Sequence, residues 1–320
     1  MKKITKYILC LLLCAFCLPV NAQAKDLIPG GQVIGLELRD NTVTVAAIDD
    51  TLGNACKVAG IAPGDRIISI DGNPVRCAED IRQILSRSHG SVSITVKRGN
   101  KEQTVTLSPQ ITSTGPKLGL YLRQGVTGVG TVTWYDPDLG TFGTLGHGVG
   151  SNGQLLDLAS GHAYRARVTT VRKGRSGAPG QLMGSIESRT PIGELTANTA
   201  QGVFGIAADR WQGAAIPVAE KNEIRTGRAT IRSTVAGTSL QEYSVEILKI
   251  YPQDRAGGRN LLLRVTDPEL LSLTGGIVQG MSGSPIIQDG KLIGAVTHVL
   301  VNDPTTGYGI FIENMLDAAA

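Results

Sequence analysis

The sequence predicts a mainly β protein built from a small α+β domain followed by a larger all-β domain. Its 320 residues include 41 glycines, about 13% against a usual value near 7%. Short runs rich in Val, Ile and Thr recur between glycine-rich turns, whereas helical periodicity is confined to two short stretches. The chain is 41% hydrophobic and 18% charged. That composition excludes wholesale disorder and a polytopic membrane protein.

Residues 1–24 have the pattern of a secretory leader. Lys2, Lys3 and Lys6 precede an apolar run over 7–20, and small residues suited to cleavage follow it. The apolar run is shorter than the ~20 residues of a membrane span, and an uncleaved N-terminal anchor is the alternative. We therefore expect an exported, extracytoplasmic protein, either free or attached to a membrane.

The net charge of +4 comes mainly from this leader, because the rest of the chain carries 28 basic and 27 acidic residues. Nothing in the charge pattern points to nucleic acid. Outside the leader the chain keeps Cys56 and Cys77, which in an exported protein form either one disulfide or two separate thiols. No His, Cys, Asp and Glu spacing is typical of a metal site, and we expect no cofactor.

The first domain is expected over residues 25–110. The segment 59–67 reads Ala-Gly-Ile-Ala-Pro-Gly-Asp-Arg-Ile, and Asp71-Gly72 follows it. A helix is indicated by apolar residues with helical spacing around Ile84, and strands over 92–97 and 103–107 flank a glycine turn. This region resembles bacterial PDZ domains.

In PDZ domains a glycine-containing loop offers backbone N–H groups to a peptide carboxylate, and the peptide adds to a sheet edge. The resemblance places that loop at the residues before and within the second strand, which are Gly30, Gly31, Gln32, Ile34, Gly35 and Leu36. The ligand would be the chain's own N-terminal segment or the tail of a partner. The alternative is that these glycines only turn the chain. A linker is expected at 111–117, where turn-forming residues lack periodicity.

The second domain is expected over 118–320, where short apolar strands predict a barrel or sandwich. Its most informative stretch is Gly280-Met-Ser-Gly-Ser-Pro285, which matches the nucleophile region of trypsin-like serine peptidases. That match implies a double β-barrel with Ser282 as nucleophile. The N–H groups of Gly280 and Ser282 would form the oxyanion hole.

A serine nucleophile needs a general base. His147 lies 135 residues before Ser282, in the first half of the domain, which suits a base supplied by one barrel and a nucleophile by the other. Asp267, 15 residues before Ser282, is the candidate that would orient the imidazole. Its Thr-Asp-Pro context is also a common turn signal. For His298 and Asp303 we expect structural roles, with peptide positioning as the alternative.

Taken together, these segments resemble the stage IV sporulation protein B family of serine peptidases. The resemblance runs from residue 27 to 316 and includes Leu118–Arg123, Gly143–His147, Gly276–Pro285 and Thr297–Pro304. It implies a PDZ domain joined to a trypsin-like double β-barrel, with the catalytic roles on His147, Asp267 and Ser282. One departure follows the histidine, where the family commonly has Asp and this chain reads Gly-Val-Gly-Ser-Asn-Gly over 148–153.

The resemblance also implies a pathway. Such proteins cross the forespore membrane into the space between two membranes, cleave themselves, and then cleave a membrane-bound regulator of an intramembrane protease, which leads to late sigma-factor activation. Two alternatives remain open at this point. One is a catalytically silent scaffold that binds a peptide tail through its PDZ domain. The other is a general envelope quality-control protease, which usually places its PDZ domains after the protease.

Overall fold

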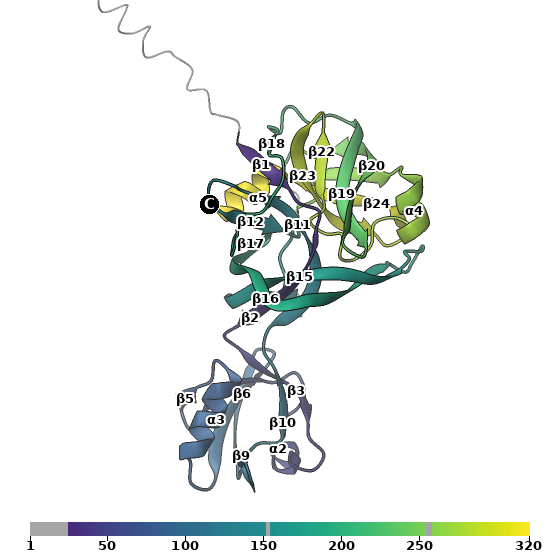
Figure 1. Ribbon diagram of the computed structural model, residues 1–320. Helices are drawn as coiled ribbons and strands as arrows, with labels where there is room; N and C mark the ends of the chain where they lie inside the picture. Colours follow the sequence, from purple (N-terminus) through teal and green to yellow (C-terminus); the bar gives the residue numbers. More distant parts are fainter. Residues whose placement is uncertain (1–24, 152–153, 254–257) are drawn as a thin grey trace, which may run out of the picture.

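The computed structural model describes residues 25–151, 154–253 and 258–320. Two β-barrels lie at one end of the molecule and a smaller domain at the other (Figure 1). The leader expected at residues 1–24 lies outside the described part of the chain. Within the described ranges, no helix is both long enough and apolar enough to span a membrane. The predicted fold class is confirmed, since strands dominate and the larger domain is a double barrel.

The first barrel closes through six strands in the order β12-β17-β16-β15-β2-β11, because β11 also pairs with β12. Two short strands, β1 and β18, extend the sheet beyond β11. A small hairpin of β13 and β14 follows β12. The bounds are β1 Asp26–Pro29, β2 Val33–Asp40, β11 Val126–Tyr135, β12 Thr141–Thr144, β13 Gly150–Ser151, β14 Gln154–Leu155, β15 Leu158–Arg172, β16 Gln181–Thr199, β17 Gly202–Ala207 and β18 Ile216–Pro217.

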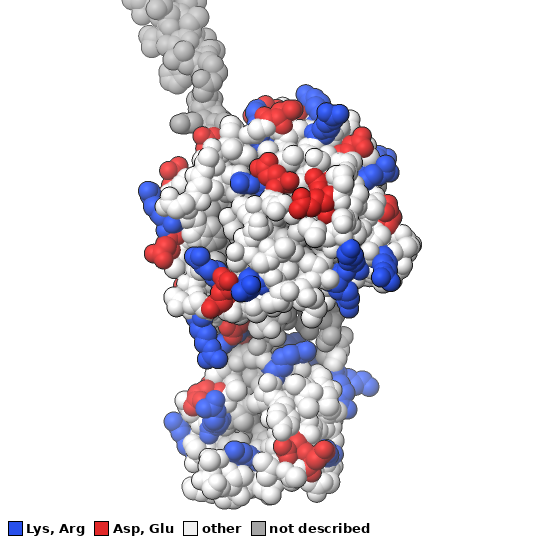
Figure 2. Space-filling model, turned by 45° about the vertical axis from the view of Figure 1, so that its right-hand side comes forward, with Lys and Arg blue, Asp and Glu red and all other residues white. Residues whose placement is uncertain are grey.

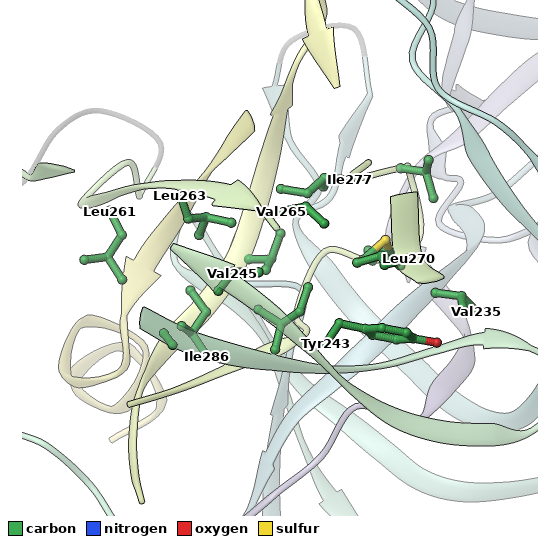
Figure 3. Close-up of a cluster of buried hydrophobic side chains, with 14 of the residues drawn as sticks. Val235, Tyr243, Val245, Leu261, Leu263, Val265, Leu270, Ile277 and Ile286 are labelled. Atoms are coloured by element: carbon green, nitrogen blue, oxygen red, sulfur yellow. The ribbon is translucent and has the colours of Figure 1, made fainter. Parts of the chain in front are cut away.

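The second barrel closes through β19-β20-β21-β24-β23-β22. Alternate residues of its strands point inward, so that Val245, Leu261, Leu263, Val265 and Ile286 meet in one buried cluster (Figure 3). A short helix, α4, separates β21 from β22, and α5 ends the chain. The bounds are β19 Gly227–Ala236, β20 Ser239–Ile250, β21 Leu261–Val265, α4 Pro268–Thr274, β22 Pro285–Gln288, β23 Lys291–Leu300, β24 Asp303–Phe311 and α5 Ile312–Ala319.

The PDZ domain has its own sheet, in the order β10-β3-β4-β6-β7, and its own core. The ion pair between Arg98 and the fully buried Asp65, at 2.6 Å, ties the β6 end to the loop before β4. A hairpin of β8 and β9 stands outside this sheet. The bounds are β3 Val43–Ile48, α2 Asn54–Val58, β4 Arg66–Ile70, β5 Asn73–Pro74, α3 Ala78–Arg87, β6 Val92–Arg98, β7 Lys101–Leu107, β8 Gln110–Thr112, β9 Gly115–Lys117 and β10 Leu120–Arg123.

The PDZ domain is inserted into the first barrel rather than placed before it. β2 enters the insertion and β11 leaves it, and the two strands pair antiparallel, with Leu38 opposite Val126. At the junction, Gly125 has φ +79°, and a Cβ there would lie 1.9 Å from the carbonyl oxygen of Leu38. Glycine is therefore required where the two connecting strands meet.

The expected domain boundaries are wrong at both ends of the PDZ domain. Residues 25–40 belong to the first barrel, because β1 and β2 pair with β11. The expected linker at 111–117 contains the β8–β9 hairpin, and β10, which was expected to begin the second domain, pairs with β3 of the PDZ sheet. The pairings of β1 and β2 with β11, and of β3 with β10, join residues about 70 to 110 positions apart, so local sequence patterns do not indicate them.

The surface charge is mixed. On the face seen in Figure 2, basic and acidic side chains alternate over both parts of the molecule. Cys56 and Cys77 are free thiols, and burial raises the pKa of the Cys56 thiol to about 11. Both cysteines therefore serve the PDZ domain as separate side chains, Cys56 in its core and Cys77 as the residue that precedes α3.

Candidate active site

Ser282 and His147 line the same cleft, which has a volume of about 440 Å³ and receives walls from both barrels. Two larger hollows, of about 1140 and 800 Å³, are lined by neither residue. Apolar side chains dominate this cleft, and among the described residues that line it none is Asp, Glu, Lys or Arg. The lining residues are Leu36, Leu38, Val126, Gly128, Val129, Leu145, His147, Val149, Pro179, Ile277, Val278, Gln279, Gly280, Ser282, Thr297, His298, Val299 and Val301.

The loop that carries Ser282 is fastened to β11 of the first barrel. The N–H of Thr131 donates to the carbonyl of Ser282 at 3.1 Å, and the Thr131 hydroxyl donates to the carbonyl of Gly280 at 2.7 Å. Gly283 has φ +96°, and a Cβ there would lie 2.1 Å from the carbonyl oxygen of Thr131. The glycine after Ser282 thus lets the two barrels approach closely. Sequence reasoning did not identify Thr131.

The geometry before Ser282 fits an oxyanion hole. The carbonyl of Gln279 accepts a hydrogen bond from the N–H of Leu182 at 2.8 Å. In a trans peptide the N–H points opposite to the carbonyl, so the N–H of Gly280 faces away from Leu182. Within the described residues, neither this N–H nor that of Ser282 has an acceptor. Both donors are available for a negatively charged oxygen.

The backbone leading to His147 has an unusual conformation. Leu145 has φ +71°, which is rare for a residue with a branched side chain, and Gly146 has φ +68°. Space also constrains Gly146, since a Cβ there would lie 2.9 Å from the Thr297 side chain. The turn after β12 is therefore specified tightly, and it delivers the imidazole to the cleft. Outliers of this kind concentrate at functional sites.

The hydrogen bond made by His147 defines its tautomer. Its Nδ1 lies 3.0 Å from the carbonyl oxygen of Gly148, and a carbonyl can only accept, so Nδ1 carries the proton. Nε2 then has the free lone pair that a general base requires. Burial lowers the pKa of His147 from its ordinary value, and the bond to Gly148 opposes that shift. The imidazole is therefore neutral at neutral pH.

His298 on β23 is the second imidazole of the cleft. Its ring centre lies 5.4 Å from that of His147, and its Nδ1 is buried without a hydrogen-bond partner among the described residues. Burial is the main cause that lowers the pKa of His298 to about 4, and the charges of His147 and Arg259 add to it. His298 is thus a neutral group beside His147. The alternative role of peptide positioning stays a prediction.

The structure does not bring Asp267 to His147. Asp267 is the N-cap of α4, and its carboxylate accepts backbone N–H groups from Ser244 at 3.2 Å and from Glu269 and Leu270 at 3.0 Å each. It does not line the cleft. This geometry contradicts its assignment as the acid that orients the imidazole. The alternative interpretation of Thr-Asp-Pro, as a turn, agrees with the place of Asp267 just before α4. Asp303 likewise bonds within its own turn, to Thr305 and Thr306.

The carboxylate loop predicted for the PDZ domain is also wrong. Gly30 and Gly31 donate to the carbonyls of Thr133 and Val132, so they belong to the first barrel. Gln32, Ile34, Gly35 and Leu36 lie at or in β2, in the same barrel. The PDZ sheet instead ends at β10, whose outer edge pairs with no described strand. Gly119, with φ +66°, precedes that edge, and the Leu118-Gly119-Leu120 sequence was the signal that could have located it.

Metal ligands do not gather in the described parts of the chain, where no three His, Cys, Asp or Glu side chains form a cluster that could hold an ion. The chemistry that these residues can perform is acyl transfer. It uses a serine nucleophile, a neutral imidazole with a free Nε2, and two backbone N–H donors.

Comparison with known families agrees with this arrangement. Residues 115–316 match the family described as SpoIVB peptidase S55, and residues 53–98 match PDZ domains. The second match lies wholly within the inserted domain. The first starts at β9, so it also includes β10 of the PDZ sheet.

Curated relatives match over shorter stretches. The putative zinc metalloprotease R01501 of Rhizobium meliloti is 31% identical over 100 residues, which cover 31% of this chain and 26% of that protein. The putative zinc metalloprotease Atu1380 of Agrobacterium fabrum is 34% identical over 79 residues, which cover 24% of this chain and 21% of that protein. The chain spans about a quarter of the length of these curated relatives.

Among solved structures, the active form of the Rv3671c protease from M. tuberculosis is 15% identical. That match covers 60% of this chain and 72% of the other, with a TM-score of 0.37. The PDZ domain of an SdrC-like protein from Listeria monocytogenes is 23% identical. It covers 26% of this chain and 87% of that one, with a TM-score of 0.23.

Proposed function

This chain belongs to the SpoIVB peptidase S55 family, and from that premise we propose that it is an exported serine endopeptidase that cleaves itself and a membrane-attached regulatory protein. Its protease character rests on the family and on the shared cleft of Ser282 and His147. The self-cleavage, the partner and the exported location are supported by the family resemblance and by the leader pattern in residues 1–24.

In this proposal, Nε2 of His147 takes the proton from Ser282 as its Oγ attacks the carbonyl carbon of the substrate. The resulting oxyanion accepts hydrogen bonds from the N–H groups of Gly280 and Ser282. The imidazolium then gives its proton to the leaving amine, and an acyl-enzyme remains. Water attacks this ester by the same route in reverse. The main observation in favour of acyl transfer is that two backbone N–H donors beside Ser282, those of Gly280 and Ser282 itself, have no acceptor among the described residues.

The lining of the cleft also supports a proposal about the substrate class. When the substrate oxygen occupies the oxyanion hole, the side chain on the acyl side of the scissile bond lies beside the same loop. That loop contributes Ile277 and Val278, and β23 contributes Val299. A charged side chain would lose its hydration there without gaining a partner. We therefore propose that the enzyme cleaves after apolar residues of modest size.

The PDZ domain would select the partner. An extended peptide can add to the free edge of β10 through main-chain hydrogen bonds. The ligand is the N-terminal segment of this chain or the tail of the partner. In a spore-forming host the substrate would be the membrane-attached regulator of an intramembrane protease, leading to late sigma-factor activation. The enzyme would then act in the space between the forespore and mother-cell membranes.

The deciding experiment compares purified wild type with Ser282→Ala and His147→Ala, with Ser91→Ala on the PDZ domain as control. Labelling by a fluorophosphonate probe and self-cleavage are both expected for wild type and Ser91→Ala. Both should be lost in Ser282→Ala, with turnover reduced by roughly 10⁴-fold or more. Equal self-cleavage in all four proteins would refute the nucleophile.

Two further outcomes separate the alternatives. A scaffold would bind its peptide with wild-type affinity yet take no probe. A quality-control protease would degrade many unfolded proteins, whereas the proposed enzyme cuts one partner at a defined site.

A further inference from the structure

Among the described residues, no carboxylate is hydrogen-bonded to His147, and the one expected to orient it caps α4. A general base of this kind still needs one fixed tautomer, because the proton on the wrong nitrogen removes the lone pair that faces the nucleophile. The carbonyl of Gly148 supplies the acceptor for Nδ1–H. A backbone carbonyl can do this only if its own segment is held in place.

Asn198, near the end of β16, holds that segment. Its Oδ1 accepts the N–H of Val149 at 2.9 Å, and its Nδ2 donates to the carbonyl of the same residue at 2.8 Å. Nδ2 also donates to the carbonyl of Leu156 at 2.7 Å. One side-chain amide therefore bonds both backbone groups of Val149, as a neighbouring strand would. The same amide also bonds Leu156, which follows the β13–β14 hairpin.

A second contact places Gly148 against the same strand. A Cβ at Gly148 would lie 2.5 Å from the carbonyl oxygen of Thr199, the residue after Asn198. The chain on the C-terminal side of His147 thus rests directly on the end of β16. Gly148 has to be glycine for this approach, whichever tautomer the imidazole adopts.

We propose that Asn198 is a positioning residue for the general base, and that it acts through Val149 and the carbonyl of Gly148 to keep the Nδ1 proton on His147. This role rests on the proposed catalysis by Ser282 and His147. An amide side chain fits position 198, because the site needs one acceptor for the Val149 N–H and donors for the carbonyls of Val149 and Leu156. A carboxylate could accept the first bond but would face two carbonyl oxygens without a proton to donate.

The test reads the tautomer directly, so it does not depend on peptidase activity. In wild type, the ¹⁵N shifts of the His147 imidazole should report a proton on Nδ1 and a free Nε2 at pH 7.5. In Asn198→Ala and Asn198→Asp, the Nε2–H tautomer should become populated. In Asn198→Ala, which removes the acceptor of the Val149 N–H, that amide should also lose protection from exchange. Asn100→Asp, on the β6–β7 turn, is the matched control and should behave as wild type.

Activity gives the second readout. In both Asn198 variants, kcat/KM should fall by roughly 10²-fold, with most of the loss in kcat, while circular dichroism shows the same fold. An unchanged tautomer in Asn198→Ala would overturn the proposal even if activity falls, since the loss would then come from elsewhere. If wild type has the expected tautomer but takes no fluorophosphonate label, the proposed function fails and the positioning role stands as a structural result.

Discussion

The hydroxyl of Ser282 donates a hydrogen bond to the carbonyl oxygen of Thr297 at 2.9 Å. That bond holds the Ser282 side chain against β23 of its own barrel, while His147, the proposed general base, belongs to the other barrel. In the proposed mechanism, attack on a substrate requires the hydroxyl to leave the Thr297 carbonyl and turn toward Nε2 of His147. A staggered rotation about χ1 is a small motion, and a substrate that bonds to the Thr297 carbonyl would release it.

The pH dependence of kcat/KM should report His147. The base works when neutral, and burial lowers its pKa below the ordinary 6.5. Activity should therefore rise with pH through a midpoint below 6.5 and be nearly constant from pH 7 to 8. The measurement is kcat/KM for a peptide with an apolar residue at the cleavage position. A midpoint at pH 7 or above would contradict a desolvated, uncharged imidazole.

Asp267 should matter for stability rather than for the tautomer of the base. Replacing a capping carboxylate by Ala costs about 1 kcal/mol, and Asp267→Asn should cost less because the amide oxygen still accepts from the α4 backbone. Denaturant unfolding measures both changes. In each folded variant, kcat/KM should stay within a few-fold of wild type. A drop near 10⁴-fold in Asp267→Asn would restore it as a member of the catalytic triad.

Local chemistry in the sequence singled out Ser282 and His147, and the structure places both in one cleft. Glycine is needed around Ser282 because Gly283 meets the Thr131 backbone, and this requirement is visible as Gly-Met-Ser-Gly-Ser-Pro. Helix α3 and the β6–β7 hairpin were also predictable, since their apolar spacing and turn residues are local signals.

Long-range contacts were not predictable in the same way. Asn198 reaches Val149 across 49 residues, and nothing in its own neighbourhood indicates a catalytic role. The pairing of β2 with β11 spans the whole PDZ domain, so the segment before the insertion was assigned to the wrong domain. The prediction for Asp267 was wrong for another reason, because a helix-capping carboxylate and a catalytic carboxylate can have the same local sequence.

Removing the PDZ domain should leave a folded peptidase. Since Leu38 and Val126 are already paired, a short Gly-Ser turn can replace residues 41–124 and close a β2–β11 hairpin. We expect the shortened protein to unfold cooperatively and to take the fluorophosphonate label at Ser282. Its kcat/KM for a short apolar peptide should stay within a few-fold of the full chain, while cleavage of a partner protein is lost. Failure to fold would show that the first barrel depends on the insertion.

His298 should make the protein less stable as pH falls. Its pKa is about 4 in the folded state and near 6.5 in the unfolded chain. Between these values the unfolded chain binds a proton that the folded protein excludes. The free energy of unfolding is therefore unaffected above pH 7 and decreases as pH drops from 6.5 to 4, by up to about 3 kcal/mol.

The variant His298→Gln should remove this part of the pH dependence, because the amide does not titrate. The exposed His89 supplies the control, and His89→Gln should keep the wild-type dependence. Urea unfolding at pH 7.5 and pH 4.5 measures the difference for each protein. An identical loss of stability in wild type and His298→Gln would mean that His298 takes up its proton in the folded state. A charged second imidazole beside His147 would then have to enter the catalytic scheme.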